Sequence, residues 1–212
     1  MSKITVKHYL NKDLNPEIKD NKIKYPIYVQ VIVLKKNLKF KSNNNYFSYL
    51  SESDIENEMI MNILNDEKKI IDVIITDLLE KGKEDLITSK NLSTYTQNLN
   101  DLIEVKFCNL IREERNGKFV PNVILNGNYS DINEIIYFYN NESPISDISE
   151  NVHYCLNAIQ SIYEDINKEN FYVYDLFGGL KHDKILSALN YSSNFDDMET
   201  NKMLMLLQHL TE

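Results

Sequence analysis

Alternating apolar and polar positions mark the first 42 residues as a β-rich segment. Residues 3–10 (KITVKHYL) and residues 38–41 (LKFK) alternate between two faces, which is the pattern of strands with one buried side. Residues 27–34 are largely apolar on both faces, so we expect them to form the central strand. A short turn at residues 35–37 would join the last two strands into a hairpin. The pattern predicts a three-stranded antiparallel sheet.

The segment that precedes the central strand is predicted to be irregular. Residues 11–24 are polar and contain Asn15-Pro16, a combination typical of turns. Pro26 has no backbone N–H to donate, so we expect it to open the central strand or to lie on a sheet edge.

After residue 50 the apolar spacing changes from two residues to the three or four of a helix. Residues 53–56 (SDIE) have the form of a capping box with Ser53 as N-cap. From there one apolar stripe continues to a stop at Gly82. We expect this helix to cover the sheet, with a break near Asn65-Asp66 as an alternative. Residues 89–96 would hold one turn.

The remainder of the chain is predicted to be helical. Apolar stripes of helical period occur at residues 99–115, 130–138, 147–167, 181–189 and 195–210. Pro121 and Asn126-Gly127 make residues 118–129 the expected linker between a head (residues 1–117) and a helical domain (residues 130–212). The predicted fold class is α+β: a three-stranded antiparallel sheet packed on a helix, followed by an all-helical body.

Charge is distributed unevenly along the chain. The net charge is −9, but residues 1–42 hold ten lysines and three acids, a net charge of +7, and residues 43–212 carry −16. A basic head on an acidic body favours a polyanionic partner, because the body repels phosphates everywhere except at the head.

Composition and spacing exclude several classes of protein and site. No apolar run approaches the roughly 18–20 residues of a membrane span, and the N-terminus lacks an apolar signal region, so we expect a soluble, cytoplasmic protein. Cys108 and Cys155 are expected to be reduced thiols. The spacing of His153 and His182 matches no zinc site, and residues 175–181 lack the spacing of a phosphate-binding loop. We predict no catalytic residue, no metal and no cofactor.

The basic hairpin is the strongest candidate for a binding surface. A β-ribbon fits the DNA major groove, where side chains on its outer face reach base edges and lysines at its tip meet phosphates. The alternative is that these lysines only prevent sheets from pairing edge to edge. The candidate contacts are Lys7, Tyr9, Tyr28, Gln30, Lys39 and Lys41 on the outer face, with Lys35, Lys36 and Asn37 at the tip.

The order of these elements carries a resemblance to a known family. A strand, a polar loop, residues 25–31 (YPIYVQV), a basic turn, residues 38–42 (LKFKS) and a helix follow one another within residues 3–81. This order resembles the N-terminal arm-type DNA-binding domain of Bacteroidetes-type tyrosine recombinases. The resemblance implies a sheet that lies in the major groove of double-stranded DNA. Gln30 stands where Arg is frequent in that family, which weakens the contact expected there.

The sequence departs from the catalytic part of that family. A tyrosine recombinase needs Arg, Lys, a His-x-x-Arg pair and a Tyr nucleophile, whereas this chain has only Arg112 and Arg115 and no His-x-x-Arg. We therefore predict a non-enzymatic DNA-binding protein, recombinase-derived or an accessory factor of a mobile element. The alternative function is a protein–protein interaction or structural module, with a homo-oligomer or protein partner bound through the acidic helical body.

Overall fold

The chain consists of two compact units, Met1–Gln97 and Asn98–Glu212. The computed structural model describes residues 3–19, 21–44, 46–99, 102, 170–191, 200, 201, 204, 205, 207 and 208. The first unit contains an antiparallel sheet followed by helices, and the described parts of the second unit are mainly helical. The predicted α+β class is confirmed.

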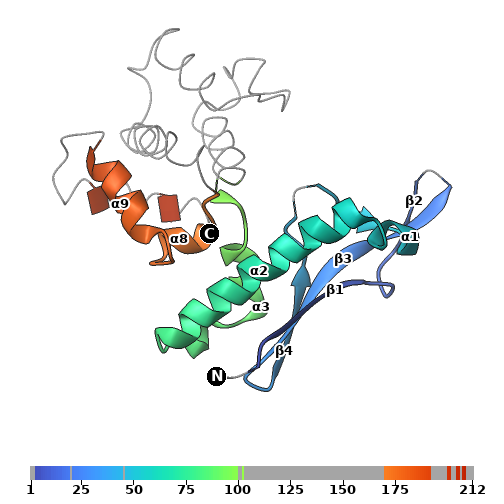
Figure 1. Cartoon of the computed structure of the whole chain (residues 1–212), viewed down its shortest axis with the longest axis horizontal. Helices are drawn as coiled ribbons and strands as arrows, with labels where there is room; N and C mark the ends of the chain where they lie inside the picture. The colour runs from blue at the N-terminus through green and yellow to red at the C-terminus, as the bar shows by residue number, and fades with distance from the viewer. Residues whose placement is uncertain are drawn as a thin grey trace, which may run out of the picture. The chain divides into compact units, whose positions relative to one another are not determined.

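A five-stranded antiparallel sheet organises the first unit (Figure 1). The central strand β3 (Lys22–Val33) pairs with β1 (Thr5–Leu10) on one side and with β4 (Lys36–Lys41) on the other. The three predicted strands are therefore present, with the predicted strand in the centre. Two short strands that the sequence did not predict, β2 (Glu17–Lys19) and β5 (Tyr49–Leu50), pair with the first part of β3.

β3 starts at Lys22, earlier than the expected start at Ile27, and Pro26 lies inside it. Pro26 is located where β3 changes partners: β2 and β5 pair with residues 22–26, and β1 and β4 pair from residue 27 or 28 onward. Because the strand pairing changes at this point, a proline, which has no backbone N–H to donate to a neighbouring strand, is tolerated there. The predicted loop at residues 11–24 was partly wrong, because the paired Ile18 and Ile23 are both exposed and produce no pattern of burial.

The turn between β3 and β4 is shorter than predicted. Val33 pairs with Lys36, so Leu34 and Lys35 form a two-residue turn in place of the expected residues 35–37. Both turn residues have positive φ, 50° and 62°, as a type I′ turn requires. The usual Asn-Gly signal of that turn is missing, which explains why the pattern misplaced it.

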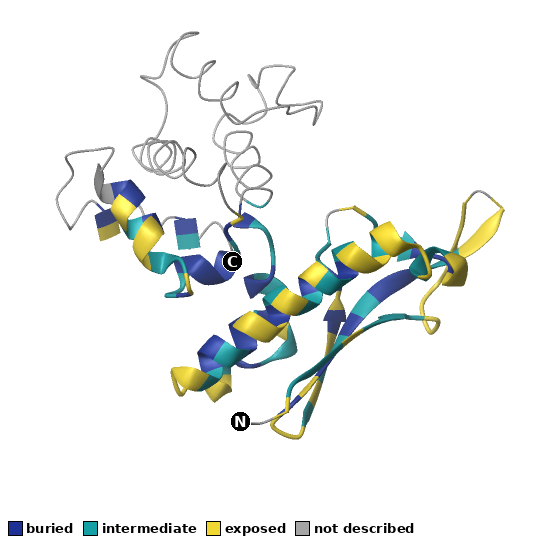
Figure 2. Ribbon diagram, viewed as in Figure 1, coloured by how far each residue is buried: buried dark blue, intermediate teal, exposed yellow. Residues whose placement is uncertain are grey.

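Helix α2 (Glu58–Glu80) covers one face of the sheet, as predicted (Figure 1). Its exposed and buried residues alternate with the helical period, with the buried side toward the strands (Figure 2). Ile27, Leu50 and Leu64 form a buried cluster between the sheet and the helix. The helix is continuous through Asn65-Asp66, so the alternative of a break there was wrong.

The start of α2 differs from the predicted capping box. Ser51 caps the short helix α1 (Glu52–Ile55), and its N–H donates to Asp54 Oδ2 at 2.9 Å. Asn57 caps α2 by accepting from the N–H of Met59 at 3.0 Å. The predicted box at Ser53 and Glu56 was therefore wrong, because the chain uses two separate caps around it.

The predicted stop at Gly82 is confirmed. Gly82 has a φ of +65°, and its N–H donates to the carbonyl of Leu79 at 3.2 Å while the N–H of Lys83 donates to that of Leu78 at 2.8 Å. This pair of bonds is the Schellman motif, which favours glycine at the left-handed position.

Residues 84–95 form more helix than the single turn that was expected at residues 89–96. A 3₁₀ turn, η1 (Glu84–Leu86), leads into α3 (Ser89–Tyr95). Thr88 caps α3 by accepting from the N–H of Asn91 at 3.1 Å. Ser89 Oγ then accepts from the backbone N–H of Lys39 at 3.2 Å, so the start of α3 covers the outer edge of β4.

The described part of the second unit contains α8 (Val173–Leu176) and α9 (His182–Tyr191). α9 confirms the helix predicted at residues 181–189. Residues 200, 201, 204, 205, 207 and 208, within the predicted helix 195–210, are helical. Several predictions lie outside the described residues: the linker 118–129, the helices at 130–138 and 147–167, and most of the helix at 99–115.

Candidate nucleic-acid interface

The strand register brings most of the predicted contacts onto one face of the sheet. Residues that pair across an antiparallel sheet point to the same side. Lys7 pairs with Gln30, which pairs with Lys39. Tyr9, Tyr28 and Lys41 form the next row. We call this surface the outer face, and its nine positions are Thr5, Lys7, Tyr9, Tyr28, Gln30, Ile32, Asn37, Lys39 and Lys41.

The outer face and the opposite, inner face differ sharply in burial. Along β3, the inner-face residues Ile27, Val29, Val31 and Val33 are buried. The outer-face residues of β3 are exposed or half-buried, and the three lysines of the face are exposed. Among the described elements, α2 packs against the inner face, and the outer face carries the more exposed residues of the sheet (Figure 2).

The outer face combines cations with aromatic rings. Its nine positions include three lysines and no acid. Lys39 Nζ lies 5.7 Å from the centroid of the Tyr9 ring, within range of a cation–π contact, and the Tyr9 and Tyr28 rings are 6.1 Å apart. Partial burial, with smaller effects of Tyr28 and Asp13, raises the pKa of Tyr9. Tyr9 therefore keeps its hydroxyl proton at neutral pH and can both donate and accept.

The three residues predicted at the hairpin tip lie in different places. Lys35 is exposed in the turn, where a phosphate contact remains a prediction. Asn37 belongs to the outer face. Lys36 is on the other side of β4, and its Nζ donates to the carbonyls of Glu84 at 3.1 Å and Ile87 at 3.2 Å. Lys36 therefore anchors β4 to the segment before α3.

Two outer-face residues were not among the predicted contacts. Thr5 and Ile32 continue the alternation that contains Lys7 and Gln30, and this pattern could have identified them. Ile32 is 43% exposed although it lies in the central strand. Beside it, Gln30 Nε2 donates to Asn37 Oδ1 at 2.9 Å.

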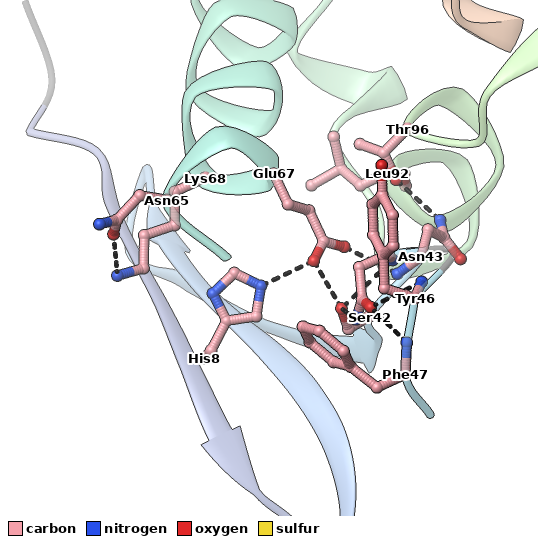
Figure 3. Close-up of polar contacts among 11 residues, drawn as sticks. His8, Ser42, Asn43, Tyr46, Phe47, Asn65, Glu67, Lys68, Leu92 and Thr96 are labelled. Atoms are coloured by element: carbon pink, nitrogen blue, oxygen red, sulfur yellow. Dashed lines mark hydrogen bonds and ion pairs between the residues drawn. The ribbon is translucent and has the colours of Figure 1, made fainter. Parts of the chain in front are cut away.

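A buried polar network under the sheet holds the strands on α2 (Figure 3). Glu67 of α2 is only 7% exposed. Its carboxylate accepts from His8 Nε2 at 2.8 Å, from the backbone N–H of Asn43 at 2.7 Å and from Ser42 Oγ. These bonds join β1 and the end of β4 to the helix. Since Glu67, and not the histidine, is the central group, the arrangement does not match a Ser-His-acid nucleophile.

The glycine-containing segment of the second unit, residues 175–181, is held in place by hydrogen bonds to the carboxylate of Asp175. Asp175 accepts from the backbone N–H of Tyr172 at 2.9 Å and from that of Lys181 at 3.0 Å. A side chain at Gly179 would meet the carbonyl oxygen of Tyr174 at 2.7 Å. These contacts give the segment a structural role in joining α8 to α9.

In the part of the chain that the structure describes, no cluster of three or more His, Cys, Asp or Glu side chains could hold a metal ion. Among the described helices, none has the length and apolar character to cross a membrane.

Comparison of the chain with protein-family models, with curated proteins and with solved structures returns no match. The outer face of the sheet is therefore the feature that points to a function.

Proposed function

We propose that this protein binds double-stranded DNA, without cutting it, through the outer face of its sheet. The observation that carries the proposal is the register, which gathers Lys7, Lys39 and Lys41 with two tyrosines on one face that has no acid among its nine positions. Lysines supply sequence-independent phosphate contacts, and tyrosine and amide side chains can reach base edges.

The dimensions of the sheet are compatible with the major groove. Neighbouring strands are about 4.8 Å apart, so β1 and β4 flank β3 over about 10 Å. The major groove of B-DNA is about 12 Å wide. Lys7 and Lys39 lie on the two flanking strands, from which their long side chains can extend toward the phosphates on either side of the groove.

The charge of the first unit supports one orientation on a polyanion. Residues 1–42, which form β1 to β4, carry +7, whereas residues 43–97, which include α1, α2 and α3, carry −6. The layer behind the sheet therefore repels phosphates, and the sheet attracts them. The resemblance to recombinase arm domains supports a role tied to a mobile element.

The test replaces the three outer-face lysines together in K7Q/K39Q/K41Q. Each phosphate contact contributes about −0.9 to the slope of log affinity against log salt concentration. With Lys35, four contacts predict a slope of about −4 for the wild type, and the triple variant should fall to about −1. Fluorescence anisotropy of a labelled duplex, measured over a series of salt concentrations, gives both slopes.

The matched control replaces three lysines of the helical layer, K69Q/K81Q/K83Q. It removes the same charge from the first unit but leaves the outer face intact, so the slope should remain near −4. Failure of the wild type to bind any duplex at low salt would exclude the proposal. An equal decrease of the salt slope in both triple variants would show that net charge alone attracts the DNA.

A further inference from the structure

We propose that Gln30, Asn37 and Ile32 select A·T base pairs in the major groove. The amide groups of Gln30 and Asn37 would recognise adenine, and Ile32 would contact a thymine methyl group. This inference rests on the proposed function and adds to it the chemical class of sequence that the outer face recognises.

The two amides form a single hydrogen-bonding unit. Gln30 Nε2 donates to Asn37 Oδ1 at 2.9 Å, which leaves Gln30 Oε1 as an acceptor and Asn37 Nδ2 as a donor. Adenine presents the complement in the major groove, a donor at N6 and an acceptor at N7, and Asn or Gln is the usual partner of that edge. Guanine presents two acceptors there, which would leave Gln30 Oε1 facing an acceptor.

The exposed isoleucine lies directly beside this pair. Ile32 is the register partner of Asn37 and lies two residues beyond Gln30 on the same face. An apolar side chain that is 43% exposed among amides and lysines has no evident role in folding. The thymine methyl is the apolar group that distinguishes an A·T pair in the major groove, so Ile32 and the amides favour the same base pair.

The backbone that carries Asn37 is fixed on both sides. On one side, the neighbouring Lys36 is held through its Nζ by the carbonyls of Glu84 and Ile87. On the other side, the N–H of Lys39 is held by Ser89 Oγ. A side chain that contacts a base from an anchored strand loses little conformational freedom on binding. This favours discrimination between bases.

The experiment selects binding sequences for the full-length chain from a pool of random duplexes, with Q30A, N37A and I32A in parallel. A correct bidentate contact is worth about 5- to 150-fold in discrimination, so an A·T preference of that order should appear at one position or more. It should disappear in Q30A and N37A. Replacing the selected thymine by deoxyuridine removes only the methyl group and should weaken wild-type binding several-fold but leave I32A unchanged.

The control variant I23A removes another exposed isoleucine of β3, 55% exposed and outside the outer face, and should retain the full deoxyuridine effect. Duplex binding without sequence preference, or a preference that Q30A and N37A keep, would overturn this inference and leave the proposed function intact. Failure of the wild-type chain to bind any duplex would overturn both.

Discussion

Glu67 joins the sheet to α2 through a buried carboxylate. It is buried and accepts from His8, Ser42 and the backbone of Asn43. In E67Q one carboxylate oxygen becomes an amide NH₂ group, which cannot accept a hydrogen bond, so at least one of these donors loses its acceptor. An unsatisfied buried donor costs about 1–3 kcal/mol, and we expect the free energy of unfolding to fall by that amount. Urea denaturation followed by circular dichroism measures it.

The control for E67Q is D72N, at an exposed position of the same helix. A surface change of this kind should alter stability by less than about 0.5 kcal/mol. If E67Q and D72N unfold at the same urea concentration, the network does not stabilise the fold and another contact must hold β1 against α2.

The turn between β3 and β4 is a site of backbone strain. Leu34 and Lys35 both have positive φ, a conformation that costs an ordinary L-residue roughly 1–2 kcal/mol. The double variant L34N/K35G supplies the residues that a type I′ turn prefers, and we expect the free energy of unfolding to rise by about 1–2 kcal/mol. Loss of Lys35 should also reduce the salt slope of DNA binding by about 0.9.

Gly82 allows the reverse substitution, in which a residue with a Cβ replaces glycine at a position of positive φ. It has a φ of +65°, and an added Cβ would meet no atom within 4 Å. G82A therefore changes only the backbone preference and should lower the free energy of unfolding by about 1 kcal/mol. A stable G82A together with an unchanged L34N/K35G would show that the backbone relaxes at these turns.

Elements whose burial follows a period were predictable from the sequence, and elements fixed by backbone geometry were not. The alternation around Gln30 and the stripe ending at Gly82 identified the sheet, its outer face and α2. The pairing of β2 with β3 was not predicted, because Ile18 of β2 is 81% exposed and gives no burial pattern. The cap at Ser51 was not predicted, because several neighbouring polar residues could take that role. The inward anchoring of Lys36 depends on carbonyls about 50 residues away in the chain, which no local pattern contains.

The two units of the chain differ in charge. Residues 1–97 hold 15 lysines and 14 acids, a net charge of +1, and residues 98–212 carry −10. The second unit should therefore repel DNA and weaken binding at low salt. Residues 1–97 contain all the described strands and the described helices that pack on them, so we expect this fragment to fold by itself.

The fragment of residues 1–97 should bind duplex DNA several-fold more tightly than the full chain at about 0.05 M salt. The difference should shrink toward about 0.5 M salt, because screening there acts over only a few ångströms. Parallel anisotropy titrations at both salt concentrations measure it, and circular dichroism confirms that the fragment is folded. A folded fragment that binds more weakly than the full chain at both concentrations would show that the second unit contributes contacts of its own, and the DNA-binding surface would then extend beyond the outer face.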